Sequence, residues 1–275
     1  MRRFLSPLLL PLLLSLLTAA TLASTLPRAL CGEEPPPRKG VREAARNFLA
    51  DGRYLVTFPT RANAKGASLT AAFLAGTVLL VGLDDEIRRE VIESDHWVPD
   101  QIATKFEPIG RYWVQAAGLG GSYLASRWSK RPRETSTAAT AFEAYLWTSI
   151  ITSAAKGLFG RERPTEGADA DDFFAGGDIF PSGHTARSFA IASVLASRHG
   201  RKAALFAYPA AALVGLATVQ EDLHWTSDIL AGAGLGLAIG KGIAARHPVP
   251  GPRGTPQARW RIVPGPGGVM LSFKD

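Results

Sequence analysis

The sequence predicts an all-α protein, a six-helix bundle, and two observations support this prediction. Apolar residues make up 46% of the 275 residues and charged residues 20%, which excludes disordered, collagenous and coiled-coil chains. Six apolar segments are rich in Ala, Leu and Gly and show few of the β-branched alternations typical of strands. These segments are Ala67–Leu83, Tyr112–Ala125, Ala138–Ala155, Ala186–Ser197, Ala203–Val219 and Ile229–Ile243.

The first 23 residues have the features of a secretory signal peptide. Arg2 and Arg3 precede a leucine-rich run from Pro7 to Ala23, which ends in small residues. The run is 17 residues long, so an uncleaved membrane anchor is the alternative. Residues 24–60 follow as a linker and N-terminal region, with three consecutive prolines at 35–37.

Residues 61–246 form the predicted helical domain, and residues 247–275 form a tail rich in Pro and Gly. In the last helix, Gly232, Gly234, Gly236 and Gly240 are typical of faces that let helices approach closely. Several apolar runs are shorter than the ~20 residues of a usual membrane span, so a soluble bundle stays open. In the tail, Trp260–Val263 and Val269–Phe273 predict a short hairpin.

Three short polar clusters lie between residues 156 and 228. They are Lys156 with Arg163-Pro164, then Pro181-Ser182-Gly183-His184, then His224 with Asp228. The first cluster follows one predicted helix, the second begins the next helix, and the third lies between the last two helices. In a bundle of alternating helices, all three clusters therefore lie at the same end.

The first two clusters have the chemistry of a phosphate site. Arg163 offers a planar fork of donors that matches phosphate oxygens, and Lys156 adds a compact positive charge. Ser182 and the free backbone N–H groups of Gly183 and His184 lie at a helix N-terminus, which attracts anions. The single cysteine of the chain, Cys31, excludes an intramolecular disulfide and any cysteine-built metal site.

The histidines add a reaction to this site. His224 can attack phosphorus if Asp228 holds its other ring nitrogen and stabilises the imidazolium. His184 is then placed to protonate the leaving alcohol. No metal or other cofactor is expected, because the protein supplies the cations.

Together the clusters resemble the type 2 phosphatidic acid phosphatase superfamily, which also includes bacterial acid phosphatases and vanadium haloperoxidases. Its pattern is Lys-x6-Arg-Pro, Pro-Ser-Gly-His and Ser-Arg-x5-His-x3-Asp, and the match runs from Lys156 to Asp228. The resemblance implies a helical bundle that hydrolyses phosphate monoesters through a phosphohistidine. It implies catalytic roles for His224, His184 and Asp228, and phosphate binding by Lys156, Arg163, Ser182 and Gly183.

One position departs from this pattern. Ala217-Thr218 stands where the family has Ser-Arg, so a phosphate ligand of the family is missing. Either the activity is weakened, the substrate differs, or another cation such as Arg161 or Arg187 has taken its place. The alternatives to a lipid phosphatase are a catalytically silent envelope protein that binds phosphate or lipid head groups, a soluble periplasmic acid phosphatase, and a vanadium-dependent haloperoxidase.

The charge distribution predicts where the site lies. The formal net charge is +7, with basic residues concentrated in the loops away from the three clusters. If the helices span a membrane, the positive-inside rule places those loops in the cytoplasm and the site outside it, in the inner membrane or periplasm of a cell envelope.

The expected partners are a membrane and a phosphorylated lipid or small phosphomonoester. Nucleic acid is not expected, because the basic residues are spread over several separate loops and form no recognisable nucleic-acid-binding module. The oligomeric state stays open.

Overall fold

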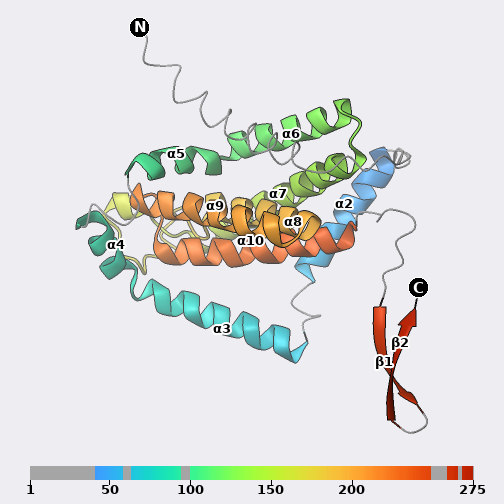
Figure 1. Ribbon diagram of the computed structural model, residues 1–275. Helices are drawn as coiled ribbons and strands as arrows, with labels where there is room; N and C mark the ends of the chain where they lie inside the picture. The colour runs from blue at the N-terminus through green and yellow to red at the C-terminus, as the bar shows by residue number, and fades with distance from the viewer. Residues whose placement is uncertain (1–40, 58–62, 94–99, 249–258, 266–267, 275) are drawn as a thin grey trace.

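The computed structural model describes residues 41–57, 63–93, 100–248, 259–265 and 268–274. Within these ranges the protein is helical apart from one C-terminal hairpin, so the predicted all-α fold class is confirmed (Figure 1). The α-helices are α2 (Val41–Val56), α3 (Ala64–Val81), α4 (Asp84–Glu93), α5 (Asp100–Gly110), α6 (Tyr112–Trp128), α7 (Pro132–Phe159), α8 (Gly183–His199), α9 (Arg201–Gln220) and α10 (Thr226–Arg246). A short 3₁₀ turn, η2, covers Pro164–Glu166.

Each of the six predicted segments falls in a different helix, namely α3 and α6 to α10. Only Ala67–Leu83 overruns its helix, because α3 ends at Val81. Helices α2, α4 and α5 lie outside the predicted segments. Helix α4 has the sequence DDEIRREVIE, and an apolar run cannot reveal a helix so rich in charge.

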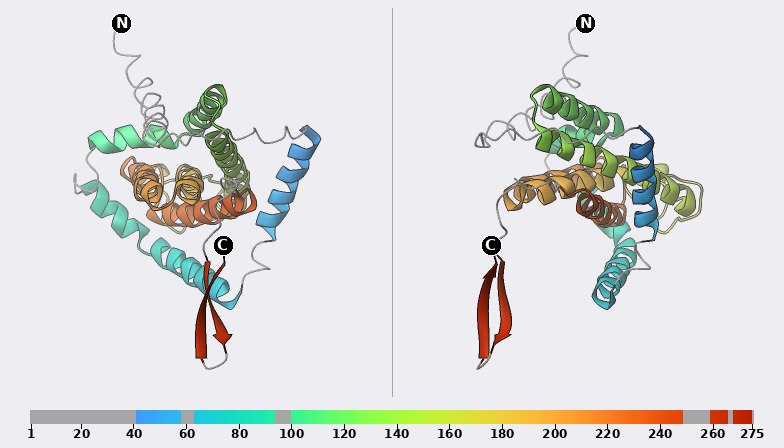
Figure 2. Two further views of the ribbon diagram at one scale, coloured as in Figure 1. Left: turned by 45° about the vertical axis from the view of Figure 1, so that its right-hand side comes forward. Right: turned by 90° about the vertical axis from the view of Figure 1, so that its right-hand side faces the viewer.

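Helix α8 lies in the middle of the bundle, with α7, α9 and α10 packed around it (Figures 1 and 2). The core between these helices consists mainly of small and branched side chains. Its buried members include Ala141, Ala144 and Tyr145 of α7, Ala190 and Val194 of α8, and Ile239 and Ile243 of α10. Small side chains let the helix axes approach, which makes α8 a rigid support for the residues at its N-terminus.

Helices α8 and α10 touch through a row of glycines on α10. A Cβ atom on Gly232 would lie 2.6 Å from the carbonyl oxygen of Ser182, and one on Gly236 would collide with the carbonyl oxygen of Ala186. Gly240 makes the same kind of contact one turn later. The close approach predicted from these glycines is confirmed, and it fixes the start of α8 against the start of α10.

Helix α3 projects from the bundle and packs mainly against α10 (Figure 1). Leu69, Leu74, Val78 and Leu79 on α3 are between 58% and 72% exposed. Helices α9 and α10 are each long and apolar enough to cross a membrane, and α3 and α4 meet the same criterion as a pair bent by 60°. Among the described residues, two or three segments therefore have the length and composition of membrane spans.

The C-terminal strands β1 (Arg259–Gly265) and β2 (Gly268–Lys274) pair antiparallel, with Trp260 opposite Phe273. The predicted hairpin is confirmed. The predicted signal or anchor segment, residues 1–23, lies outside the described residues. Of the region predicted as a linker, residues 24–60, the structure describes 41–57, which form α2 and the residue after it.

Candidate active site

The three polar clusters meet where α7, α8 and α10 have their ends. Lys156 lies in the last turn of α7, α8 begins after Ser182, and α10 begins at Thr226. The backbone N–H of Ser182 donates to the carbonyl oxygen of Asp228 at 3.0 Å, which ties the second cluster to the third. The structure therefore brings together clusters that lie far apart along the chain.

Two histidines face each other in this region. The ring centroids of His184 and His224 lie 6.1 Å apart, and the ring planes meet at 69°. Nδ1 of His224 lies 3.2 Å from Oδ2 of Asp228, so Nε2 is the nitrogen that remains for a substrate. His224 is 4% exposed and Asp228 is fully buried.

Asp228 is held by more than His224. Its Oδ2 accepts from the backbone N–H of Trp225 at 3.0 Å, which closes the first turn of α10. Its Oδ1 accepts from Nη1 of Arg161 at 2.5 Å. Because both oxygens of Asp228 accept hydrogen bonds, the carboxylate is held in one orientation. The bond between this carboxylate and Nδ1 then fixes the orientation of the His224 ring.

The N-terminus of α8 supplies the second part of the site. Ser182 is the N-cap and fully buried, and its Oγ accepts from the backbone N–H of Thr185 at 3.4 Å and from Thr185 Oγ1 at 3.1 Å. Both bonds use the oxygen of Ser182 as acceptor, so its hydroxyl hydrogen remains a donor. The unpaired N–H groups of the first turn give this end of α8 a preference for anions.

Positive side chains surround the same point. Arg163 donates from Nη2 to Oδ1 of Asp178 at 2.9 Å, and its charge acts on both Lys156 and His224. Burial, opposed by the nearby Asp178 carboxylate, lowers the pKa of the Lys156 ammonium. Burial would raise the pKa of Asp178, but the hydrogen bond from Arg163 and the charge of Lys156 bring it below its ordinary value. This carboxylate therefore stays ionised and orients Arg163.

Both histidines are neutral at pH 7 in the absence of an anion. Burial, together with the nearby charges of His224, Arg187 and Lys156, lowers the pKa of His184 to about 3. Burial also lowers the pKa of His224, although Asp228 works in the opposite direction. A neutral His224 retains the lone pair that a nucleophile needs.

A buried network supports the site from behind. Arg161 is fully excluded from solvent and donates to Ser227 Oγ at 2.7 Å, as well as to Asp228. Its Nη2 meets Oδ2 of Asp84 at 2.8 Å, and Asp84 also accepts from the backbone N–H of Ser227 at 2.9 Å. Arg161 stands inside the Lys-x6-Arg spacing, but no sequence signal connects Asp84 of α4 to the site.

Helix α5 adds residues beside His184 that also escape sequence reasoning. Oε1 of Glu107 lies 3.6 Å from Nε2 of His184, and Arg111 pairs with the same carboxylate at 3.0 Å. A Cβ atom on Gly110 would lie 2.8 Å from Cδ2 of His184, so α5 packs directly on this ring.

Comparison with known families accounts for the combination of clusters. Residues 137–249 match the model of the PAP2 superfamily. All seven predicted site residues lie inside this segment. The resemblance of the three clusters to this superfamily is thereby confirmed.

The chain is similar to one curated protein and to two solved structures. A lipid A 1-phosphatase from Porphyromonas gingivalis is 33% identical over 94 residues, which cover 33% of this chain and 19% of that protein. The matched part thus spans about a fifth of the relative's length. The crystal structure of Aquifex aeolicus LpxE matches 57% of this chain and 92% of its own, with 23% identity and a TM-score of 0.45. A transmembrane PAP2 type phosphatidylglycerolphosphate phosphatase from Bacillus subtilis matches 64% and 94%, with 18% identity and a TM-score of 0.47.

Thr218 stands where the PAP2 pattern has its third-cluster arginine. Its side chain is fully buried, and its hydroxyl donates to the carbonyl oxygen of Gly215 at 2.7 Å within α9. Two arginines outside the predicted site set approach residues of the three clusters, Arg161 at Asp228 and Arg187 at Gly183. Arg161 takes part in the buried network described above, and Arg187 lies one turn into α8.

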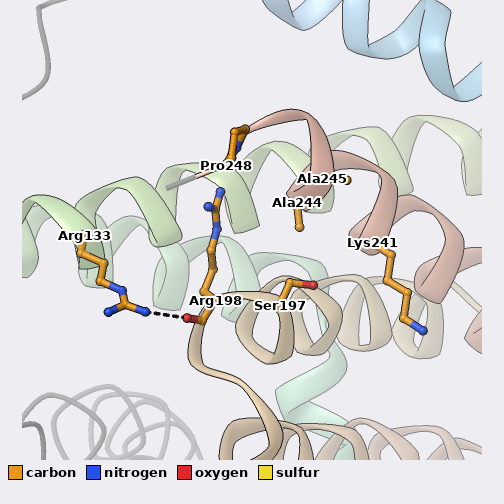
Figure 3. A pocket seen from close by; sticks show the side chains of 7 residues that line it. All are labelled: Arg133, Ser197, Arg198, Lys241, Ala244, Ala245 and Pro248. Carbon is orange, nitrogen blue, oxygen red and sulfur yellow. Dashed lines mark hydrogen bonds between the residues drawn. The ribbon is translucent and has the colours of Figure 1, made fainter. Parts of the chain in front are cut away.

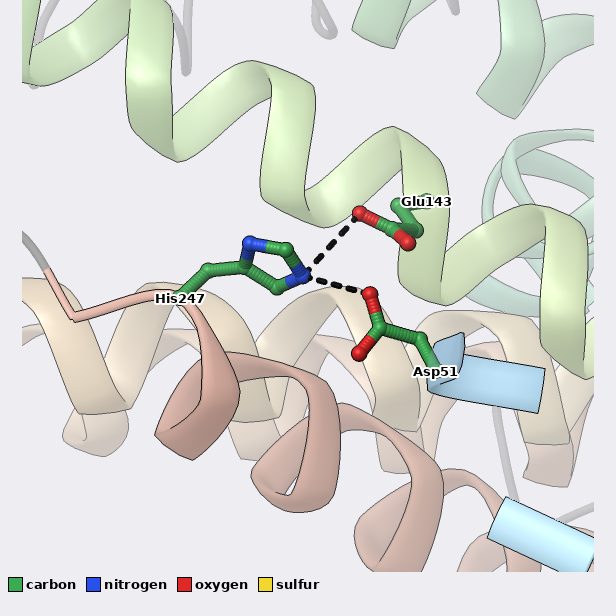
Figure 4. Close-up of side chains that lie close together, drawn as sticks. All are labelled: Asp51, Glu143 and His247. Carbon is green, nitrogen blue, oxygen red and sulfur yellow. Dashed lines mark hydrogen bonds and ion pairs between the residues drawn. The ribbon is translucent and has the colours of Figure 1, made fainter. Parts of the chain in front are cut away.

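The opposite pole of the PAP2 bundle carries two other features. Asp51, Glu143 and His247 have the spacing of metal ligands, and Nε2 of His247 lies 2.7 Å from Asp51 and 3.4 Å from Glu143 (Figure 4). Arg246 also pairs with Asp51. A cavity of about 590 Å³ lies nearby, lined by Arg133, Ser197, Arg198, Lys241, Ala244, Ala245 and Pro248 (Figure 3). Neither feature includes a residue of the phosphate clusters.

Proposed function

We propose that this protein is a metal-independent phosphatase that hydrolyses a phosphate monoester through a phosphohistidine. One observation carries the proposal. The His224–Asp228 pair and His184 face each other next to a helix N-terminus and two cations, Lys156 and Arg163. Such a set offers a nucleophile, a proton donor and an anion site together.

In the first step, Nε2 of His224 attacks phosphorus and the bond between phosphorus and the ester oxygen breaks. The Asp228 carboxylate stabilises the positive charge that develops on the ring. Lys156 and Arg163 neutralise the phosphate oxygens, while Ser182 and the backbone N–H of Gly183 donate hydrogen bonds to them. The leaving alkoxide takes its proton from His184.

The low pKa of His184 means that it needs a proton before it can serve as an acid. A phosphate anion bound next to the ring raises this pKa, because it stabilises the imidazolium form. Substrate binding and protonation of His184 are therefore coupled. In the second step, neutral His184 accepts a proton from water, which attacks the phosphohistidine and releases inorganic phosphate.

We propose a phosphorylated lipid as the substrate. Apolar side chains such as Leu74 and Val78 of α3 and Leu205 and Phe206 of α9 are strongly exposed, as lipid-facing positions are. Helices α9 and α10 have the length of membrane spans. The name of the curated relative, lipid A 1-phosphatase, points to the same class of substrate.

We propose that the site faces away from the cytoplasm, in an envelope membrane or the periplasm. The opposite pole carries basic residues on α7, α8 and α10, including Arg133, Arg198, Lys241 and Arg246. Under the positive-inside rule that pole is cytoplasmic. We also propose that residues 61–246 form one helical domain, between an N-terminal signal or anchor segment and the C-terminal tail.

A phosphate-release assay tests the proposal. Purified protein in detergent is given lipid and soluble phosphomonoesters, with and without EDTA. We expect release from lipid substrates that EDTA does not reduce and that vanadate blocks. His224→Gln should abolish release, whereas His199→Gln, at the other end of α8, should not change it. Wild-type turnover in His224→Gln would refute the assigned nucleophile.

Thr218 favours one second candidate, a protein that binds phosphate or lipid head groups without turnover. The phosphate-release assay separates this candidate from the phosphatase, because such a protein would release no phosphate from any ester. It would still bind vanadate. Release from soluble esters only would instead favour an acid phosphatase.

A further inference from the structure

The loss of an arginine at position 218 poses a question about the proposed phosphatase. In the family pattern that arginine binds phosphate, and Thr218 can donate only a hydroxyl, which is already bonded to the Gly215 carbonyl. Position 218 lies on the side of α9 that faces the site, since a Cβ atom on Gly215 would lie 3.0 Å from Thr185 Oγ1. A site that lacks this charge needs it from another element.

Arg161 is excluded as the replacement. It is fully buried, its Nη1 donates to Ser227 and Asp228, and its Nη2 donates to Asp84 and to the carbonyl oxygen of Ala170. The guanidinium also lies 4.7 Å from the ring centroid of Phe173. Every terminal nitrogen of Arg161 is thus occupied behind the site.

Arg187, in contrast to Arg161, has a terminal nitrogen that its bonds to the protein leave for another acceptor. It is half-buried on α8, one turn beyond Gly183, and its charge acts on both His184 and Lys156. Nε donates to Oε1 of Gln115 at 3.3 Å, and Nη2 donates to the carbonyl oxygen of Gly110 at 3.2 Å. These two bonds hold the guanidinium plane and leave Nη1 for another acceptor.

Nη1 of Arg187 lies over Gly183. A Cβ atom on Gly183 would approach it to 2.9 Å, so the absence of a side chain there makes room for the guanidinium. Gly183 is the first residue of α8, where the backbone N–H groups attract an anion. A phosphate bound to those N–H groups would therefore lie within reach of Nη1.

Gln115 of α6 is itself fixed. Its Nε2 donates to Ser188 Oγ at 2.8 Å, and Ser188 Oγ donates to the carbonyl oxygen of His184 at 2.8 Å. An amide bonded at both ends holds Arg187 in one rotamer before substrate arrives, which reduces the entropy lost on binding.

We infer that Arg187 binds a non-bridging oxygen of the substrate phosphate in place of the arginine missing at position 218, and that Gln115 is its positioning residue. The inference rests on the proposed function and deepens it. It also explains how a chain with Thr218 keeps three cations around one phosphate, because Arg187 joins Lys156 and Arg163.

The test measures vanadate affinity and phosphate release for the full-length wild type and for Arg187→Gln, Arg187→Lys and Arg198→Gln. Vanadate binding, followed by equilibrium dialysis, needs no turnover. We expect Arg187→Gln to weaken vanadate binding by about tenfold or more, since a charge-assisted bond is lost. The lysine variant keeps the charge without the fork and should fall between the wild type and the glutamine variant.

Arg198→Gln is the matched control. Arg198, drawn in Figure 3, is a buried arginine on the same helix at the opposite pole. It donates to Thr140 Oγ1 and to the carbonyl oxygen of His247. Its loss should change stability but leave vanadate affinity within about twofold. Vanadate affinity unchanged in both Arg187 variants, or an equal loss in Arg198→Gln, would overturn the inference.

Gln115→Leu tests the positioning role separately. It should weaken vanadate binding in the wild type but add nothing in the Arg187→Gln background, because the two residues act on one contact. Equal effects in both backgrounds would show that Gln115 acts independently of Arg187. A wild type that neither binds vanadate nor releases phosphate would refute the proposed function itself, whereas a functional wild type with unaffected Arg187 variants would refute only this inference.

Discussion

Arg161 and Asp84 form an ion pair of 2.8 Å between two side chains that are both fully buried. The pair joins α4, which lies outside the PAP2 match, to the loop that follows α7. Since Arg161 also holds Asp228 at 2.5 Å, the carboxylate behind His224 depends on a residue from a distant helix. Asp84 therefore belongs to the support of the site.

Asp84→Asn should destabilise the protein while leaving its shape nearly unchanged. The amide keeps the size of the carboxylate and leaves Arg161 paired with Asp228, but it has only one oxygen to accept the bonds from Arg161 and Ser227. A buried donor left without its acceptor costs about 1–3 kcal/mol. We expect a clear fall in the thermal unfolding midpoint, measured by intrinsic fluorescence in detergent. Asp85→Asn, at the exposed neighbour, is the control and should change the midpoint little. Equal midpoints for Asp84→Asn and the wild type would contradict the support role.

Asp228→Asn should act on the rate of reaction. The amide cannot stabilise the His224 imidazolium or fix the proper tautomer, and a comparable exchange behind a catalytic histidine costs about 10⁴ in kcat. We expect kcat to fall by about 10³–10⁴ with a small change in KM. Asp222→Asn, which removes a nearby carboxylate paired with Arg88, should keep kcat close to the wild type. A kcat for Asp228→Asn within tenfold of the wild type would argue against the assigned pair.

The stability of the protein should fall in acid because of His184. Its pKa is about 3 in the folded protein and 6.5 ordinarily, so the unfolded chain binds a proton between these values and the folded chain does not. Stability therefore increases with pH across this window, and the contribution of neutral His184 is complete above about pH 6.5 and lost as the pH falls toward 3. The groups that face the ring are Glu107 of α5, Arg111 at the N-cap of α6, Lys156 of α7, Arg187 of α8 and His224.

Chemical denaturation at a series of pH values measures this effect. The free energy of unfolding of the wild type should decline more steeply between pH 6.5 and pH 4 than that of His184→Gln. Parallel curves for the two proteins would contradict a buried, neutral His184. Bound phosphate should reduce the difference, because an anion beside the ring raises its pKa.

Gly183→Ala should lower activity without unfolding the protein. The added methyl group meets Nη1 of Arg187 at 2.9 Å, and a flexible side chain can move away from it. The moved guanidinium loses its alignment with phosphate, and a small displacement of this kind costs about ten- to a hundredfold in rate. Gly157→Ala in α7 is the control, because a Cβ atom at position 157 would meet nothing within 4 Å. Replacing this glycine with alanine should stabilise the helix by about 1 kcal/mol. Full activity in Gly183→Ala would show that this contact does not position Arg187.

The sequence by itself determined the elements whose signals are local. Six apolar runs predicted six helices, alternating segments predicted the hairpin, and three polar clusters at fixed spacing named the residues that gather at one end of the bundle. Alternation of helices was enough for that last step, because helix ends on one side must be neighbours. Charge-rich α4 and the Pro108-containing α5 gave no such signal.

Only the tertiary structure decided which arginine faces the site. Arg161 and Arg187 are both arginines and lie at similar distances along the chain from the clusters. The guanidinium of Arg161 forms ion pairs with Asp84 and Asp228, whereas Nη1 of Arg187 lies next to Gly183. Glu107 also reaches His184, and Asp84 reaches Arg161 and Ser227, from helices far away in sequence. Such contacts depend on how helices pack in three dimensions. The spacing of residues along the sequence does not show which side-chain donors already form hydrogen bonds within the fold.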